Sequence, residues 1–280
     1  MKRLKKIFSI LFLLFISSLI FCSCTTGRYI YVATPPNNPY FVHKGDSKIG
    51  AYYSSSGGNT TENNFARGID LQGAYAIGKY WALAGSYSGR KERDMYDYGG
   101  YQSGFSNSEV NYKRNFAELA AGVFTPINPK KTITINFYAG GGTGKFSFLD
   151  LGSDINHLTY SRFYNANTAK FFFQPSVNFI TSEYFRFSFI LKSSYVHYKN
   201  AKTNYTNNEL QSFNLADLTK HTFNFIEPAW NFQFGLPKYP WGKFEFSLSG
   251  IANHPFEIDN IRQNNSSVGF TFDISKMNKK

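Results

Sequence analysis

The sequence is poor in cysteine and has no long hydrophobic segment after its first residues. Cys22 and Cys24 are the only cysteines, so no disulfide can form further along the chain. Past residue 21 no stretch approaches the roughly 20 apolar residues that a transmembrane helix needs, and the mean hydropathy is -0.34, which excludes a polytopic helical membrane protein. Charged residues make up only 17%, but aromatic residues reach 19%, which excludes a disordered chain.

The N-terminal segment has the layout of an export signal. Four cations precede residues 7–21, an apolar stretch too short to span a membrane comfortably. The Ser23-Cys24 step is similar to a lipoprotein signal, in which cleavage leaves Cys24 as a lipidated N-terminus. An ordinary signal cut nearby and an uncut anchor remain alternatives. We therefore divide the chain into a signal peptide (1–23), a lipidated periplasmic linker (24–46), a barrel (47–274) and a basic periplasmic tail (275–280).

The body of the chain alternates apolar and polar residues with a period of two, as β-strands do. Phe185, Phe187 and Phe189, for example, alternate with Arg186 and Ser188. Ten such segments are predicted, with eight or twelve as alternatives: 47–54, 66–76, 81–90, 109–125, 132–147, 169–180, 185–197, 221–234, 243–252 and 266–274. Short turns alternate with long polar loops. This pattern predicts an all-β, antiparallel transmembrane β-barrel with short periplasmic turns, extracellular loops and both termini in the periplasm.

Aromatic residues favour a membrane barrel over a soluble barrel, because alternation alone fits both. A periplasmic aromatic girdle is predicted at the short turns from Tyr80, Trp81, Tyr184, Tyr239 and Trp241. Tyr87, Tyr112, Tyr195 and Tyr198 are expected to form the opposite girdle. The last strand is similar to the C-terminal signal that the barrel-assembly machinery reads, with Gly269, Phe270, Phe272 and Ile274 as its residues.

Charged residues also fall on the face predicted to line the lumen. The predicted interior charge network comprises Asp70, Arg114, Glu118, Arg186, Lys192, Glu227, Lys243, Glu245 and Asp273. Ten strands enclose little space, so we expect these ions to pair and fill the lumen; a charged channel lining is the alternative. The glycine run at 140–145 lacks the first glycine and the Ser/Thr of a phosphate loop, and we expect it to make room for neighbouring aromatic side chains.

The sequence offers little support for catalysis. His157, His197 and His221 lie in or near the long loops, and His197 near Ser193 and Ser194 is the nearest approach to a hydrolase pair. We expect no catalytic residues, no cofactor and no metal site, because the histidines are scattered and no free cysteine remains. A hydrolase at the barrel rim remains a second alternative function.

Cys24, the Tyr/Pro/Asn-rich segment 29–41 and the segment 68–77 together resemble small outer-membrane β-barrel lipoproteins of the Bacteroidota, a porin-like barrel family. The resemblance implies an outer-membrane location and no catalytic residues. In that group acidic residues after the lipidated cysteine direct the protein to the cell surface. Residues 25–28 contain none, so the N-terminus is predicted to stay in the periplasm.

The expected function is non-enzymatic: a structural or interaction role, such as an accessory subunit of a larger outer-membrane complex. A narrow porin-like channel for small solutes is the alternative. The expected partners are outer-membrane lipid and lipopolysaccharide, the barrel-assembly machinery and another outer-membrane protein. Nucleic acid is not expected. Removing residues 1–23 lowers the formal net charge from +12 to +8, since they carry four cations and no anion, and anionic lipid would meet that charge.

Overall fold

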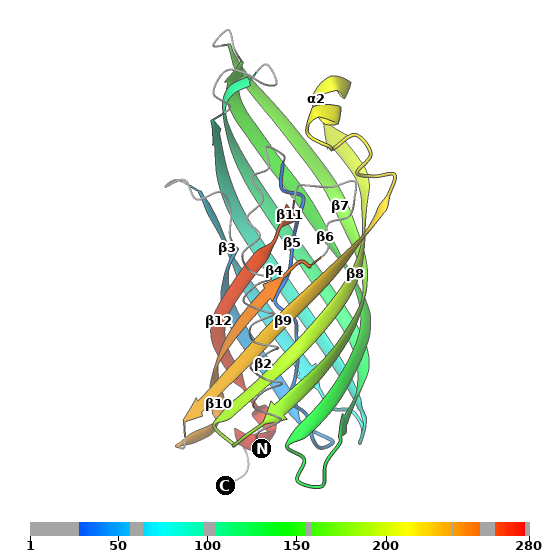
Figure 1. Ribbon diagram of the computed structural model, residues 1–280, viewed down its shortest axis with the longest axis vertical. Coiled ribbons are helices and arrows are strands. Elements are labelled where there is room, and N and C mark those ends of the chain that lie inside the picture. The colour runs from blue at the N-terminus through cyan, green and yellow to red at the C-terminus, as the bar shows by residue number, and fades with distance from the viewer. Residues whose placement is uncertain are drawn as a thin grey trace, which may run out of the picture.

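Ten antiparallel strands form a closed barrel (Figure 1). The computed structural model describes residues 28–56, 64–97, 105–154, 158–236, 238–252 and 261–277. The barrel strands are β2 (Ser47–Ser56), β3 (Phe65–Tyr75), β4 (Trp81–Asp97), β5 (Phe105–Pro126), β6 (Ile133–Asp154), β7 (Thr159–Ile180), β8 (Phe185–Thr203), β9 (Thr222–Leu236), β10 (Tyr239–Gly250) and β12 (Asn264–Phe272). Neighbours follow chain order, and β12 pairs with β2 to close the ring. The predicted fold class and strand number are confirmed.

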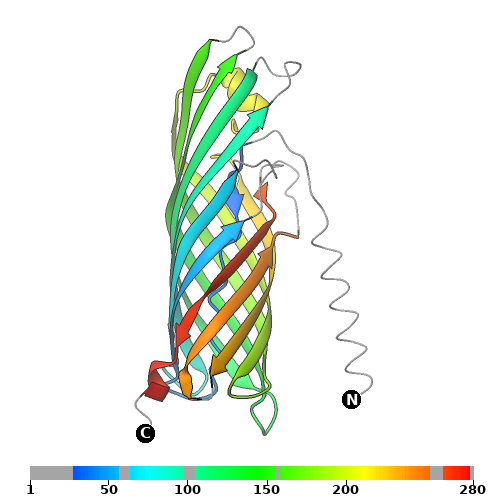
Figure 2. The same cartoon turned by 90° about the vertical axis from the view of Figure 1, so that its left-hand side faces the viewer.

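The wall is much taller on one side than on the other (Figures 1 and 2). Strands β5, β6 and β7 have 22 residues each, whereas β2 has 10 and β12 has 9. A membrane-spanning strand needs about 9–11 residues, so the tall strands continue well beyond one membrane-spanning length at the long-loop end. The predicted strand ends near 90, 147 and 197 were therefore wrong. Beyond these ends the contrast that marks a strand in the sequence disappears: on β4 the outward Lys91 is charged like the inward Glu92, and on β6 the inward Phe148 is as apolar as the outward Leu149.

The barrel is polar inside and apolar outside, which is typical of a transmembrane barrel. Leu119, Ile69 and Phe270 face outward and are 76%, 62% and 61% exposed. Asn178 and Asn231 face the lumen and are fully buried. An aqueous solvent would favour the reverse distribution, because burying polar groups costs free energy and burying apolar groups gains it.

The segment from residue 28 to residue 42 passes through the lumen, and this corrects the prediction of a periplasmic linker at 24–46. Its two-residue strand β1 (Tyr31–Val32) pairs in parallel with β11 (Ile261–Arg262), inside the ring. Arg28 lies at the long-loop end, and the segment turns into β2 at the short-turn end, where Gly45 at φ +87° donates a hydrogen bond to the Ala76 carbonyl. We call residues 28–42 the lumen segment. Residues 24–27 lie outside the described part of the chain.

The remaining elements close the two ends. Helix α2 (Asn207–Ser212) and the residues after it cover the long-loop end. Helix α3 (Ile274–Met277) follows β12 at the short-turn end, so the last strand stops at Phe272 and the tail begins as a helical turn. In the described part of the chain, no helix has the length and apolar character needed to cross a membrane.

Candidate functional site: the occupied lumen

Four charged residues form a cluster at mid-height in the lumen. Glu118 on β5 accepts Lys192 of β8 at 2.8 Å and Lys170 of β7 at 2.9 Å. Lys170 also lies 3.7 Å from Glu227 of β9. The four side chains are almost completely buried and their formal charges cancel. We call Glu118, Lys170, Lys192 and Glu227 the central cluster. Such pairing offsets the large cost of removing charges from water.

Tyr31 joins the lumen segment to this cluster. Its hydroxyl donates to Glu227 Oε1 at 2.8 Å and accepts from Lys170 Nζ at 2.9 Å. Its ring stacks on Phe225, with 4.1 Å between the ring centroids. Tyr31 thus supplies both packing and two charge-assisted hydrogen bonds, which are stronger than neutral ones.

A second charged group lies nearer the long-loop end. Arg262 of β11 and Arg114 of β5 both donate to the buried Glu92, at 2.6 and 2.8 Å. Arg262 also pairs with Asp94, and Arg114 donates to the backbone carbonyls of Tyr29 and Ile30. These contacts fix both inserted segments, the lumen segment and β11, to the wall.

Arg28 anchors the lumen segment beneath helix α2 and the residues around it, which we call the cap, at the long-loop end. Its Nε donates to Asp150 Oδ2 at 3.0 Å, and both side chains are fully buried. Tyr205, just before α2, donates to the same carboxylate, and the Phe213 ring lies 4.1 Å from the guanidinium carbon. Burial raises the pKa of the Tyr205 hydroxyl, with a further contribution from Asp150, so it remains a donor. The cap is therefore bonded to the lumen segment.

Amide side chains hold the half of the lumen segment nearer the short turns. Asn38 donates to Asn178 at 2.7 Å and accepts from Asn136 at 3.2 Å, and Tyr40 donates to Ser188 at 3.1 Å. Phe41 then packs edge-on against Phe124, with 5.8 Å between the ring centroids. The lumen segment therefore contacts the barrel wall from Arg28, near the long loops, to Phe41, near the short turns.

The void found beside Tyr31 in the lumen is small. It has a volume of about 50 Å³ and is lined by Ile30, Arg114 and Lys170 among others. Since a water molecule needs roughly 10–15 Å³ of such volume, this void holds a few waters at most. This conformation therefore offers no room there for an organic solute.

The nine residues of the predicted interior charge network lie on or next to the barrel strands, but the structure does not bring all of them together. Asp70 lies 3.7 Å from Arg90, and Glu245 accepts Lys48 at 3.1 Å. Lys243 donates to the Pro240 carbonyl, and the Arg186 guanidinium lies 5.9 Å from the Tyr40 ring centroid. Asp273 lies at the short-turn end, where it accepts the Ser275 hydroxyl.

The sequence prediction missed several charged residues of the lumen: Arg28, Lys48, Arg90, Glu92, Asp94, Asp150, Lys170 and Arg262. Glu92 shares the phase of other inward residues on β4, so a longer strand assignment would have found it. Lys170 has the inward phase within the predicted strand 169–180 and was overlooked there. Arg28 and Arg262 carry no such signal, because their segments do not alternate.

The aromatic residues predicted for the short-turn girdle lie at that end. Trp81 begins β4 and is 59% exposed, and Tyr239 packs edge-on against Trp241 at 5.7 Å. Tyr80 and Tyr184 are also exposed there. The opposite girdle needs correction: Tyr87 and Tyr195 face outward, but Tyr112 and Tyr198 are only 1% exposed and face the lumen, because they occupy inward phases of β5 and β8.

No protein-family model and no curated protein matches this chain. Solved structures that resemble it are outer-membrane β-barrel proteins. The translocator domain of autotransporter NalP from Neisseria meningitidis is 10% identical, with 83% of this chain and 89% of that chain covered and a TM-score of 0.47. An outer-membrane channel from Pseudomonas putida F1 is 8% identical, with 86% and 99% covered and a TM-score of 0.39.

The outer-membrane protease OmpT from Escherichia coli is 10% identical to this chain, with 82% of this chain and 95% of that chain covered and a TM-score of 0.38. Similarities this distant concern the barrel fold alone. They carry no information about activity.

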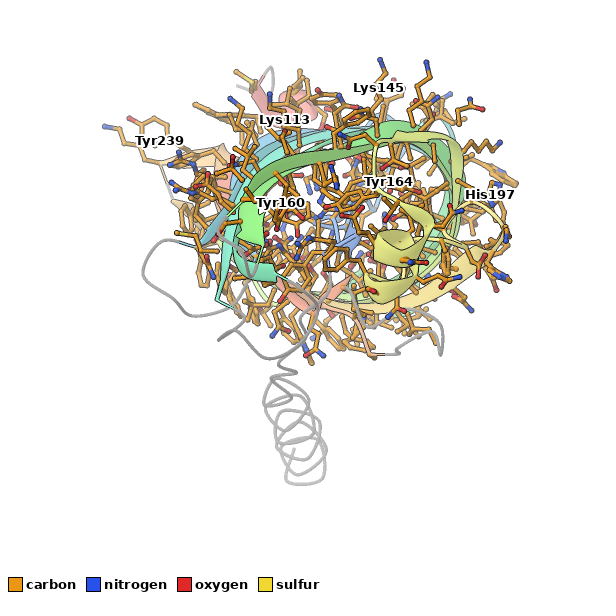
Figure 3. All side chains as sticks on the ribbon, turned by 90° about the horizontal axis from the view of Figure 1, so that it is seen from above. Lys113, Lys145, Tyr160, Tyr164, His197 and Tyr239 are labelled. Carbon is orange, nitrogen blue, oxygen red and sulfur yellow. The ribbon has the colours of Figure 1, made fainter. Side chains whose placement is uncertain are left out.

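The serine and histidine side chains that came nearest to a hydrolase pair in the sequence are not brought together at the rim. Ser193 and His197 share the outer face of β8 but are four residues apart, or about 13 Å along a strand. Ser194 faces the lumen and is fully buried. His197 Nδ1 donates a hydrogen bond to the His221 carbonyl at 3.1 Å, and the side chain points away from the barrel axis (Figure 3). His157 lies outside the described residues, within which no group of metal-binding side chains occurs.

Glycines in the wall leave room for larger side chains. A Cβ on Gly142 would lie 2.6 Å from Phe116, and one on Gly144 would lie 2.5 Å from the same ring. The run at 140–145 is thus part of β6 and makes space in the lumen. In the predicted assembly signal, Phe270 and Phe272 face outward, Gly269 faces inward against Tyr52, and Ile274 begins α3 instead of extending the strand.

Proposed function

We propose that this protein is a non-enzymatic outer-membrane β-barrel lipoprotein of the Bacteroidota type, with a structural or interaction role. The observation that carries the proposal is the occupied lumen: the lumen segment bonds to the wall from Arg28 at one end to Phe41 at the other. A solute cannot pass through the barrel where buried ion pairs and aromatic rings fill the cross-section of the lumen. The surfaces left for function are the outer wall and the rim.

The tall wall and its cap favour interaction outside the membrane. Strands β5 to β7 exceed a membrane-spanning length by about ten residues each. At that end Tyr164 points inward, toward the cap side of the ring (Figure 3). A packed aromatic cluster there, including Phe148 and Tyr205 at 6.0 Å, makes the extension rigid. A rigid platform beyond the membrane suits the binding of another envelope protein.

The course of the lumen segment revises the proposed position of Cys24. Arg28 lies at the long-loop end, and four residues span about 14 Å at most. With the long loops outside the cell, a lipid on Cys24 would enter the outer leaflet, instead of the inner leaflet expected from the sequence. An epitope tag placed after Cys24 should then react with antibody on intact cells; reaction only after permeabilisation would refute this placement.

Conductance in planar bilayers tests the closed lumen. The natural chain should give no steady current, and a variant whose residues 28–41 are replaced by a Gly/Ser segment of equal length should conduct, because its lumen loses the packed side chains. Both must show the heat-modifiable gel mobility of a folded barrel. Steady current through the natural chain would refute the proposal and support the narrow channel; a silent Gly/Ser variant would show that the segment does not close the lumen.

A pull-down from outer membranes in mild detergent tests the interaction role. Tagged natural protein should recover one envelope protein in stoichiometric amount, as quantified by mass spectrometry. A tagged barrel of unrelated sequence, expressed at the same level, is the control. Recovery of the protein alone would contradict an accessory role.

A further inference from the structure

Three cations lie side by side on the outer face of the barrel. In the strand register Arg67 of β3 is directly opposite Lys91 of β4, and Lys91 is directly opposite Lys113 of β5. All three side chains are exposed. We call them the cationic row. Lys145 of β6 lies diagonally next to Lys113, since its register partner is Asn115, and Figure 3 shows both lysines pointing away from the barrel.

The cationic row lies at one specific height on the wall. Lys91 follows the girdle residue Trp81 by ten positions on β4. Ten residues measure about 33 Å along a strand, and a tilt near 40° reduces this to about 25 Å along the membrane normal. That is about the height of the apolar band of a transmembrane barrel. The cationic row therefore lies at the membrane interface opposite the tryptophan girdle.

The same spacing recurs on the neighbouring strands. Lys113 and Val123 of β5 are ten positions apart, as are Lys145 and Ile135 of β6. Between them the outward side chains are apolar or small except for Asn115, and Leu119 is the most prominent at 76% exposed. The cations thus lie at about the same height on four adjacent strands, at the end of this span nearer the long loops.

The protein itself supplies little negative charge to the cationic row. The described outward carboxylate nearest in register is Glu109, two outward positions beyond Lys113 on β5, and it is paired with Arg93 at 2.7 Å. Among the described residues, no salt bridge joins a carboxylate to Arg67, Lys91 or Lys113. Like charges directly opposite on adjacent strands destabilise a sheet. An external anion would relieve this repulsion.

We propose that the cationic row binds the phosphate groups of an outer-leaflet glycolipid of the lipid A class. Phosphates at the top of the apolar band would meet the guanidinium and the ammonium groups while the acyl chains lie against the band below. The inference rests on the proposed outer-membrane placement with the long loops outside, because only then does the row face the outer leaflet.

Binding of fluorescent diphosphoryl lipid A to the purified full-length protein in neutral detergent tests this assignment. The variant R67Q/K91Q/K113Q removes the three charges and keeps a polar side chain at each position. Each cation near an anionic lipid surface contributes about fivefold to binding, so the affinity should fall about a hundredfold. If this variant lacks the gel mobility of a folded barrel, K91Q/K113Q should still weaken binding about 25-fold.

A matched control removes three cations from the short-turn end. Lys79, Lys130 and Lys238 are exposed there, and K79Q/K130Q/K238Q changes the net charge by the same amount. This variant should bind lipid A as the natural chain does. An equal loss in both variants would overturn the proposal in favour of unspecific attraction, and so would unchanged binding by R67Q/K91Q/K113Q.

Two further ligands distinguish the source of the phosphate. Phosphatidylglycerol in the same assay should bind more weakly than lipid A; equal binding would refute a glycolipid site. Millimolar inorganic phosphate should fail to displace lipid A, and full displacement would leave a site for free phosphate only. Binding in detergent does not depend on whether the lumen conducts. A failure to bind lipid A therefore does not contradict the closed lumen, and a current through the natural chain does not contradict lipid A binding.

Discussion

Removing one carboxylate from the central cluster should destabilise the barrel strongly. In Glu118→Gln the cluster changes from neutral to a net positive charge, and Lys192, whose ammonium group lies 2.8 and 3.0 Å from the two Glu118 Oε atoms, loses its carboxylate partner. Lys170 keeps Glu227 and Tyr31. Breaking a buried ion pair by removing one partner costs about 3–5 kcal/mol. We expect the free energy of unfolding to fall by about that amount.

A second substitution, which should raise the stability again, makes the prediction specific. Adding Lys192→Met to Glu118→Gln restores a neutral cluster. In the natural chain Lys192 Nζ lies 4.2 Å from the centroid of the Phe172 ring, and a methionine can keep this packing. The double variant should therefore be more stable than Glu118→Gln alone, by about 1–3 kcal/mol. As an exposed comparison, Glu109→Gln breaks the partly exposed pair with Arg93 and should cost about 1 kcal/mol or less.

Urea titration of the protein refolded in lipid vesicles measures these differences. The three tryptophans report unfolding by fluorescence, and loss of heat-modifiable mobility reports it independently. If the double variant is no more stable than Glu118→Gln, the buried ammonium group is not the source of the instability. The electrostatic account of the central cluster would then be wrong.

Other substitutions test the wall, the cap and the rim. Gly269→Ala should cost about 1–3 kcal/mol in the same titration, because its Cβ would lie 2.1 Å from a carbonyl oxygen of β2; Gly73→Ala, with no neighbour nearer than 3.8 Å, should be tolerated. At the cap, burial acts to raise the pKa of Glu209, but hydrogen bonds from Thr206 outweigh it and leave that pKa below its usual range. The carboxylate therefore stabilises α2 above its unfolded pKa, and limited proteolysis of α2 should become faster as the pH falls through the lower folded value; an unchanged rate would refute this. Replacing His197 should leave any peptide or lipid hydrolysis unchanged, and a loss of activity would contradict the outward geometry found for it at the rim, where its ring is bonded to the His221 carbonyl.

Local alternation made the transmembrane part of the wall predictable. Strands such as β8 expose Phe187 and Phe189 to the membrane and bury Arg186 and Ser188 in the lumen, so the chemical contrast between adjacent residues is large. The contrast vanishes further along the tall strands. On β4 both the outward Lys91 and the inward Glu92 are charged, and the predicted strand ended at residue 90, before the observed end at Asp97.

The sequence by itself determined ten membrane-spanning strands in a barrel without cysteine, because these features depend on residue types and on residues that are neighbours in the chain. Only the tertiary structure decided what fills the barrel. Tyr31 meets Glu227 across 196 positions, and Arg28 meets Asp150 across 122. The lumen segment has no periodic pattern, since its side chains match partners on different strands around the ring. Its place, and with it the closed lumen, follows from long-range pairing of buried charges that must find partners when water is excluded.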